Sequence, residues 1–142
     1  MKINISSDHA GFKLKNSIVT FLSKKHEIND LGPYLEDSVD YPDFAHKLVK
    51  DLIENKVIMG ILICGSANGI SMAANKHKDV RAAVCWNTEI ATLAKQHNNA
   101  NILSLPARFI TESEAFDIIK AFIDTDFEGG RHLRRVNKIN CV

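Results

Sequence analysis

Residues 58–69 join an apolar stretch to a run of small residues, and this junction has the clearest potential for chemistry. Residues 58–64 are nearly all apolar, and Gly65-Ser66-Ala67-Asn68-Gly69 follows directly. Small side chains let a ligand approach the backbone, and successive N–H groups at the start of a helix bind anions. Cys64 stands at the mouth of this loop, where a helix dipole would lower the thiol pKa below ~8.5. We predict an anion site beside a thiolate base or nucleophile; a buried cysteine that only ends a core strand is the alternative.

Two histidines stand at the ends of predicted elements. Asp8 and His9 follow the first predicted strand, so both would face the same crevice as Cys64, although Asp8 also fits an ordinary helix N-cap. His97 closes the fourth predicted helix. A helix C-terminus favours an imidazolium, which explains His97 without any catalysis. A functional and a structural interpretation therefore both stand for these residues.

Arginines gather near the C-terminal end of the sequence. Only five of the 18 basic residues are Arg, and Arg131, Arg134 and Arg135 follow Gly129-Gly130. A guanidinium binds phosphate through two parallel hydrogen bonds, which lysine cannot make. These arginines, with Arg108 after the fifth predicted strand, are candidates for gripping a phosphate. A solvated basic tail is the alternative, and it is the usual reason for a charge cluster.

Several familiar active sites are excluded by the residues themselves. The sequence has no GxxxxGK[ST] loop, and no GxGxxG follows the first predicted strand. A phosphatase loop that began at Cys64 would need Arg at position 70, where Ile70 stands. A receiver domain would need an aspartate at the position of Cys64. Neither HxxxH nor CxxC spacing, both typical of metal sites, occurs in the chain.

The elements that must position these residues alternate between two periodicities. Period-two or continuous apolar runs predict strands over residues 2–6, 27–31, 58–64, 80–85 and 101–105. Helical spacing predicts helices over residues 14–25, 42–53, 69–77, 88–97 and 115–123, the last behind the capping box Thr111-Glu112-Ser113-Glu114. This alternation predicts an α/β fold, a three-layer, doubly wound, Rossmann-like parallel sheet of about five strands. With the common order 2-1-3-4-5, strands one and three would meet at the switch point where ligands bind.

Composition predicts a single ordinary domain. The chain has 142 residues, 45% hydrophobic and 25% charged, and a chain of this size buries roughly 70% of its unfolded surface.

A net charge of +1 argues against nucleic acid as a partner. The sequence has no apolar run of membrane-spanning length and no signal-peptide core. Three cysteines without a CxxC argue against a disulfide framework and a zinc site. We therefore expect a cytoplasmic protein that binds neither membrane nor nucleic acid.

Six short motifs, in order along the chain, resemble the ribose-5-phosphate isomerase type B family. This family belongs to a group of sugar-phosphate isomerases that also includes galactose-6-phosphate isomerase subunits. The motifs are Ser7-Asp8-His9-Ala10-Gly11, Asp40-Tyr41-Pro42, Ile63-Cys64-Gly65-Ser66-Ala67-Asn68-Gly69, Ala73-Ala74-Asn75-Lys76, Gln96-His97-Asn98 and Glu128-Gly129-Gly130-Arg131-His132. Each motif alone is weak, but six in register are specific and cover essentially the whole domain.

The resemblance implies an aldose–ketose isomerase of the non-oxidative pentose phosphate pathway. It would interconvert ribose 5-phosphate and ribulose 5-phosphate without metal or organic cofactor, as one domain over residues 1–142 with a C-terminal basic segment at 125–142. A homodimer or dimer of dimers with active sites shared between subunits is also implied. The implied catalytic residues are Cys64 as base, His97 in ring opening and Ser66 beside the reacting end. The implied substrate-binding residues are Asp8, His9, Gly65, Ser66, Ala67, Asn68, Gly69, Asn98, Arg108, Arg131 and Arg135. Arg134 lies outside the positions that match the family, and we interpret it as part of a solvated basic tail.

Two positions bear on how far the resemblance extends. Ala67 stands where the family usually has Gly, and its methyl group disfavours a positive φ and narrows the loop mouth. One branch of the family uses a Glu base six residues after the position of Cys64, but here that residue is Ile70. Two alternatives stay open: a hexose-phosphate isomerase acting on galactose 6-phosphate or allose 6-phosphate, and a sugar-phosphate sensor without activity. The motif Gln96-His97-Asn98 favours the pentose enzyme.

Overall fold

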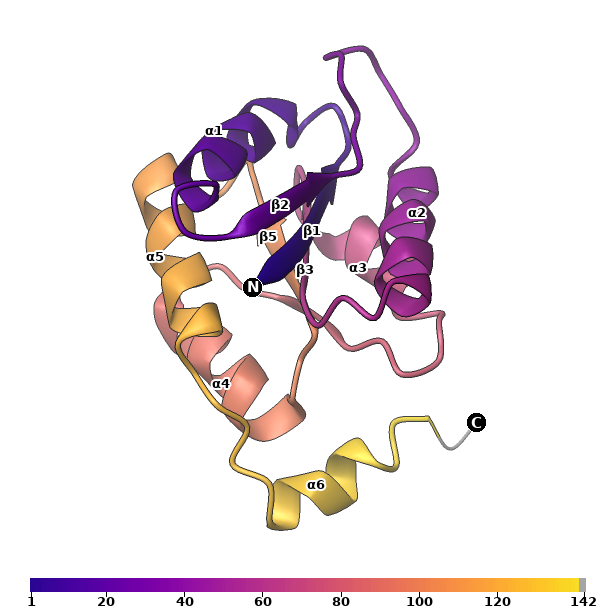
Figure 1. Ribbon diagram of the computed structural model, residues 1–142, viewed down its shortest axis with the longest axis vertical. Coiled ribbons are helices and arrows are strands. Elements are labelled where there is room, and N and C mark those ends of the chain that lie inside the picture. The colour runs from indigo at the N-terminus through magenta and orange to yellow at the C-terminus, as the bar shows by residue number, and fades with distance from the viewer. Residues whose placement is uncertain (141–142) are drawn as a thin grey trace.

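Five parallel strands form one sheet with helices on both faces (Figure 1). The structure is a computed structural model that describes residues 1–140; Cys141, for which the sequence offers no partner at motif spacing, lies outside the described residues. The strands are β1 (Lys2–Ser7), β2 (Glu27–Asp30), β3 (Gly60–Cys64), β4 (Ala82–Val84) and β5 (Ile102–Pro106). The predicted three-layer, doubly wound α/β fold is confirmed.

The strand order corrects one expectation. The order is β2-β1-β3-β5-β4, so β1 and β3 are neighbours as expected, but β5 rather than β4 pairs with β3. All residues of β5 are buried, whereas the three residues of β4 are only half-buried. The longer, fully covered strand takes the inner place because an inner strand of a parallel sheet is packed on both faces. The short β4 is left at the edge.

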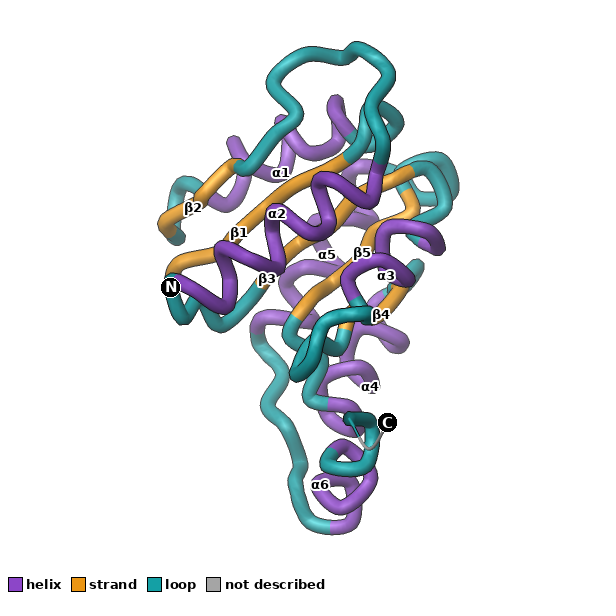
Figure 2. The backbone as a smooth tube through the Cα atoms, turned by 90° about the vertical axis from the view of Figure 1, so that its right-hand side faces the viewer, coloured by secondary structure: helices purple, strands orange, loops and turns teal. Residues whose placement is uncertain are grey.

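Helices cover the two faces of the sheet unequally. The helices are α1 (Phe12–Leu22), α2 (Tyr41–Glu54), α3 (Asn68–Ala74), α4 (Thr88–Asn98), α5 (Glu112–Ile123) and α6 (Arg131–Val136). Helices α1, α4 and α5 lie on one face and α2 and α3 on the other (Figures 1 and 2). Two apolar cores result, one on each face. The sequence did not predict α6, because six residues are too few to show an apolar stripe.

Local signals fix where the helices begin. The predicted capping box of α5 is present, since Thr111 Oγ1 accepts from the Glu114 N–H at 3.1 Å and the Glu114 carboxylate accepts from the Thr111 N–H at 2.7 Å. Pro42 lies in the first turn of α2, where a missing N–H costs nothing.

No helix in residues 1–140 has both the length and the apolar character that crossing a bilayer requires.

The register of the strands brings three loops to one edge of the sheet. Ser7 pairs with Ile63 and Cys64 with Pro106, so β1, β3 and β5 end side by side. The loops after them carry Asp8 and the run that starts at Gly65. Ligands of doubly wound sheets bind at such an edge.

Candidate active site

A cleft of about 410 Å³ opens at the carboxyl ends of β1 and β3. The structure gathers there most of the residues that the sequence suggested for the loops after β1, β3 and β5. Three further lining residues, Ala10, Tyr41 and Phe109, had been given no role. The cleft is lined by Asp8, His9, Ala10, Tyr41, Cys64, Gly65, Ser66, Gly69, Arg108 and Phe109.

The Cys64 thiol lies at the base of this cleft and is only 5% exposed. Its sulfur accepts a hydrogen bond from the Ala67 N–H at 3.1 Å. Burial nevertheless raises the pKa of the thiol, with help from the Asp8 carboxylate, while the N–H groups of Ile70, Ala67 and Ser66 act in the opposite direction. The expected lowering of this pKa is therefore wrong. The seven-residue α3 supplies donors but cannot offset removal from water.

The loop after Cys64 has the tight path that its small residues suggested. Ala67 adopts the left-handed conformation with φ +63°, which a methyl group disfavours, and it is fully buried. The Ser71 hydroxyl donates to the Ala67 carbonyl at 2.7 Å and holds this turn. A Cβ on Gly69 would lie 2.5 Å from the Tyr41 ring, so only glycine fits beside that ring. The loop is a rigid cradle of backbone amides.

Asp8 and His9 have partners that fix their orientation. The Asp8 carboxylate accepts from the Gly11 N–H at 3.1 Å in the turn before α1, but the N-cap of α1 is Gly11, so the N-cap interpretation of Asp8 is wrong. His9 Nδ1 accepts from the Val39 N–H at 3.3 Å, which leaves its other nitrogen for a ligand. Asp8 lines the cleft although it is mostly buried.

Arg108 closes the same edge from the β5 side. The backbone N–H of Arg108 donates to the Gly65 carbonyl at 3.1 Å, and this hydrogen bond joins the segment after β5 to the loop after β3. A Cβ on Gly65 would lie 3.1 Å from the Arg108 guanidinium, so the side chain runs directly over the loop backbone. Arg108 is exposed and therefore free to meet an anion held by the loop.

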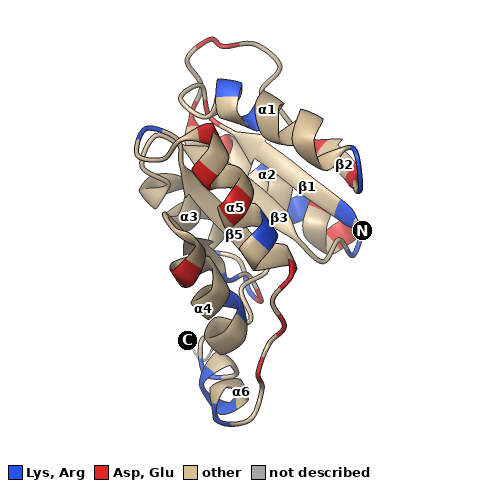
Figure 3. Cartoon of the chain, turned by 90° about the vertical axis from the view of Figure 1, so that its left-hand side faces the viewer, with Lys and Arg blue, Asp and Glu red and all other residues tan. Residues whose placement is uncertain are grey.

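The remaining predicted site residues lie at the opposite end of the molecule. His97 and Asn98 end α4, ahead of the start of β5, whereas Cys64 pairs with the last residue of β5. The 11 residues of α4 span about 16 Å. Arg131 and Arg135 lie on α6, which is packed against α4. Figure 3 shows a basic α6 preceded by an acidic segment. One chain therefore does not bring His97, Asn98, Arg131 or Arg135 to the cleft.

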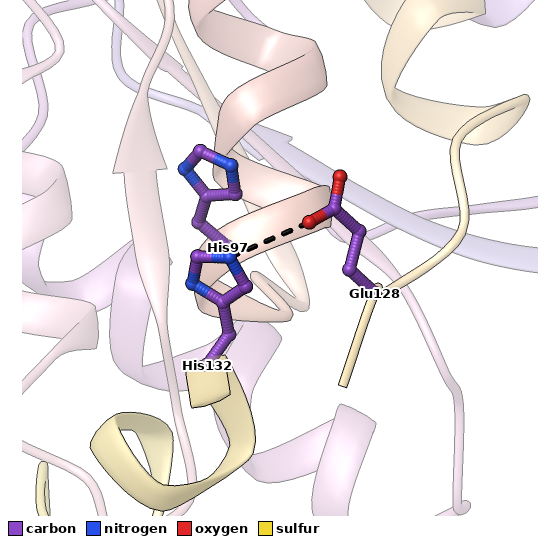
Figure 4. A group of neighbouring side chains, drawn as sticks. All are labelled: His97, Glu128 and His132. Carbon is purple, nitrogen blue, oxygen red and sulfur yellow. Dashed lines mark ion pairs between the residues drawn. The ribbon is translucent and has the colours of Figure 1, made fainter. Parts of the chain in front are cut away.

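His97 has an unexpected neighbour in His132. The two rings stack with centroids 4.3 Å apart and planes within 8°, and Glu128 lies beside them (Figure 4). His132 Nε2 is 3.4 Å from a Glu128 carboxylate oxygen. Glu128 and His132 both belong to the motif Glu128-Gly129-Gly130-Arg131-His132. Nothing in that motif alone indicates that the His132 ring contacts α4, which lies some thirty positions earlier in the sequence.

The same three side chains are the one group of three or more His, Cys, Asp or Glu in residues 1–140 whose ligand atoms lie close enough to share a metal ion, within 4.8 Å of one another. An imidazole nitrogen binds a metal in the plane of its ring. Because the planes of His97 and His132 are nearly parallel and stacked, a single ion cannot lie in both. The arrangement is suited to a ring stack and does not fit a metal centre.

Comparison with known proteins gives consistent matches over nearly the full chain. A family model described as Ribose/Galactose Isomerase matches residues 3–139. A putative sugar phosphate isomerase of Rickettsia bellii is 47% identical over 138 residues, 96% of either chain. The crystal structure of a ribose 5-phosphate isomerase from Thermotoga maritima has a TM-score of 0.97 at 49% identity, covering 99% of this chain and 98% of its own. Ribose-5-phosphate isomerase B of Mycoplasma genitalium, solved with bound ribulose-5-phosphate, has a TM-score of 0.94 at 46% identity, covering 99% and 94%.

Proposed function

The chain belongs to the ribose/galactose isomerase family, and on this premise we propose that it interconverts D-ribose 5-phosphate and D-ribulose 5-phosphate. The observation that carries the proposal is a thiol placed under backbone amides in an open cleft at the switch point of the sheet. The enzyme is an isomerase of carbohydrate metabolism, in the non-oxidative pentose phosphate pathway of the cytoplasm. Residues 1–142 form its single domain, with the basic segment at 125–142.

The chemistry needs one base and a site for negative charge. The Cys64 thiolate takes the proton from C2 of the open-chain aldose, and the electrons of that bond form an enediolate. The thiol returns the proton to C1, while the hydroxyl proton of O2 passes to O1. Backbone N–H groups over residues 65–69 stabilise the charge on the oxygens, which is where a preorganised site gains most. Ser66 is exposed at the cleft and stands beside the reacting end.

Ribose 5-phosphate is mostly a furanose, so its ring must open before the proton can move. His97 is the acid–base group for this step, and Asp8 and Asn98 bind the substrate hydroxyls. His9, Arg131 and Arg135 grip the phosphate, and Arg108 adds a further binding contact. A grip on the remote phosphate places the reacting carbons against Cys64.

These roles require two copies of the chain. Cys64 and His97 lie at opposite ends of the sheet, and a pentose phosphate is far shorter than their separation along β5 and α4. In a homodimer, or a dimer of dimers, each cleft would receive His97, Asn98, Arg131 and Arg135 from a second copy. A two-fold axis then gives two identical shared sites.

A hexose-phosphate isomerase is the second candidate, because Ala67, which stands where the family usually has Gly, holds the buried turn between the cleft residues Ser66 and Gly69. Turnover of ribose 5-phosphate, galactose 6-phosphate and allose 6-phosphate separates the two. We expect the highest kcat/KM for ribose 5-phosphate. A higher value for either hexose phosphate would overturn the pentose assignment.

Proton exchange tests whether the protein is an enzyme or a sensor. In heavy water, the parent protein should introduce deuterium at C2 of ribose 5-phosphate during turnover, whereas a protein that only binds the sugar cannot break a C–H bond. Cys64→Ala should bind the substrate but introduce none. Binding by the parent protein without exchange would contradict the proposed isomerase.

A further inference from the structure

His132 is a buried histidine that the proposed reaction does not use. Its side chain is 7% exposed, and its Nε2 is completely buried without a hydrogen-bond partner in the part of the chain that the structure describes. A Glu128 carboxylate oxygen lies 3.4 Å from this Nε2, a contact that becomes an ion pair only when His132 is protonated. A buried imidazole in this state is unusual for a surface helix and needs an explanation.

The backbone around His132 is tied to the end of the helix that carries His97. The Glu128 N–H donates to the Gln96 carbonyl at 3.1 Å, one residue before His97. The His132 N–H donates to the Gly129 carbonyl at 3.0 Å and starts α6. The segment from Glu128 to His132 therefore keeps a fixed position relative to His97, and the two rings meet face to face at 4.3 Å.

We propose that His132 is a positioning residue for His97, and that its ring fixes the plane in which His97 delivers protons to the substrate. This inference rests on the proposed function, because it concerns the ring-opening step. His132 is too buried to touch the sugar itself, whereas His97 is only half-buried. Proton transfer needs the imidazole nitrogen within hydrogen-bond reach of the ring oxygen, so a freely turning His97 would be a poor acid.

The charges around the stack are compatible with this role. Burial lowers the pKa of His132, and so do His97 in α4 and Arg131 and Arg135 in α6, while Glu128 in the preceding segment acts in the opposite direction. His132 is therefore neutral at neutral pH and presents an uncharged face to His97. A neutral ring tolerates a protonated partner, whereas two imidazolium rings at this distance repel each other.

Two reactions separate positioning from a general structural role. Turnover of ribose 5-phosphate needs ring opening. Exchange of the C1 hydrogen of ribulose 5-phosphate with heavy water does not, because this ketose has no free hydroxyl with which to close a furanose. His132→Ala should lower kcat for ribose 5-phosphate about 10- to 100-fold, as a misplaced catalytic group does. Its KM and the C1 exchange rate should stay within about two-fold of the parent. His132→Phe, which keeps a flat ring, should recover most of the lost kcat.

Further variants make the outcome decisive. His97→Asn should show the same pattern as His132→Ala, and the double variant should be little worse than His97→Asn alone, because both act on one step. Arg134→Ala, an exposed substitution on the same helix, should change neither reaction. Equal loss of turnover and exchange in His132→Ala, or a His132→Phe as slow as His132→Ala, would overturn the proposal. A parent protein without either reaction would instead refute the proposed function.

Discussion

At the scale of single residues, Cys64 as the proposed base should set the pH dependence of the reaction. Burial raises the pKa of its thiol, so the base is mostly protonated at neutral pH. We expect kcat/KM to rise with pH, approaching ten-fold per unit between about pH 6 and 8.5, because only the thiolate accepts a proton. Cys64→Ser should lose at least about 10³-fold, since a serine hydroxyl is a far weaker base.

The control for Cys64 is the other free cysteine that the structure describes. Burial raises the pKa of Cys85 to about 12, and its side chain is fully buried, so it stays an inert thiol. Cys85→Ala should keep activity within about two-fold and the same rising pH profile. Thiol reagents should inactivate the parent, and bound sugar phosphate should protect it. Full activity after complete modification of Cys64 would exclude the thiolate base.

Ala67 tests how the loop selects its substrate. Relief of the left-handed strain in Ala67→Gly gains about 1 kcal/mol, but the loss of a buried methyl group and the freer unfolded chain cost about as much. We expect the free energy of unfolding to change by less than about 1 kcal/mol, while the less constrained turn lets the cleft loop adjust to a longer sugar and raises kcat/KM for allose 6-phosphate relative to ribose 5-phosphate. Ala73→Gly in α3, a control, should leave this ratio unchanged. An unchanged ratio in Ala67→Gly would show that the methyl group does not limit sugar size.

At the scale of elements, the sequence predicts the type of each strand and most helices but not their neighbours. The apolar run at residues 58–64 predicts a strand covered on both faces, and the capping box at Thr111 predicts a helix start. Both signals are local to a few residues and can therefore be recognised in the sequence. The place of β5 between β3 and β4 depends on packing across the whole sheet, which no local pattern encodes. The stack of His97 on His132 was missed for the same reason, since it joins α4 to a helix too short to predict.

The end of β2 is held to α1 by the buried ammonium group of Lys15. Lys15 in α1 is 1% exposed and binds Asp30 at the end of β2, and the Asp30 carboxylate also accepts from the Gly32 N–H at 2.9 Å. The pair holds the start of the loop whose Val39 N–H orients His9. Lys15→Met should lower the free energy of unfolding by about 2–4 kcal/mol, because it leaves a partly buried carboxylate without its cation. It should also raise KM, because the phosphate contact that we propose for His9 would loosen.

Chemical denaturation with a matched variant checks this claim. Lys13 in the same helix pairs with Glu36 at 3.5 Å but is exposed, so Lys13→Met should cost less than about 0.5 kcal/mol. In Lys15→Met/Asp30→Asn the unpaired charge is gone, and part of the stability should return. Equal midpoints for Lys15→Met and Lys13→Met would mean that the buried pair does not hold this loop.

At the scale of the whole molecule, the two groups of site residues lie at opposite ends of one chain, so the division of labour can be tested by mixing inactive variants. Cys64→Ala lacks the proposed base and His97→Asn lacks the proposed ring-opening group. Their mixed dimer has one cleft with both defects and one cleft with none. Random pairing makes about half of the dimers mixed, and each of these has one intact site, so co-expression should restore about a quarter of the parent activity.

The control is a pair of variants in which both chains are substituted at the same residue, Cys64. Cys64→Ala co-expressed with Cys64→Ser leaves every cleft without a thiol, so no activity should return. Recovery in the first pair and not in the second would require that Cys64 and His97 act on one substrate from different copies. If each chain instead used its own His97, every cleft of the first pair would carry one defect, and its activity would stay at the level of the separate variants. Helix α4, about 16 Å long, carries His97 at its far end from the cleft edge of its own chain, which makes recovery the expected result.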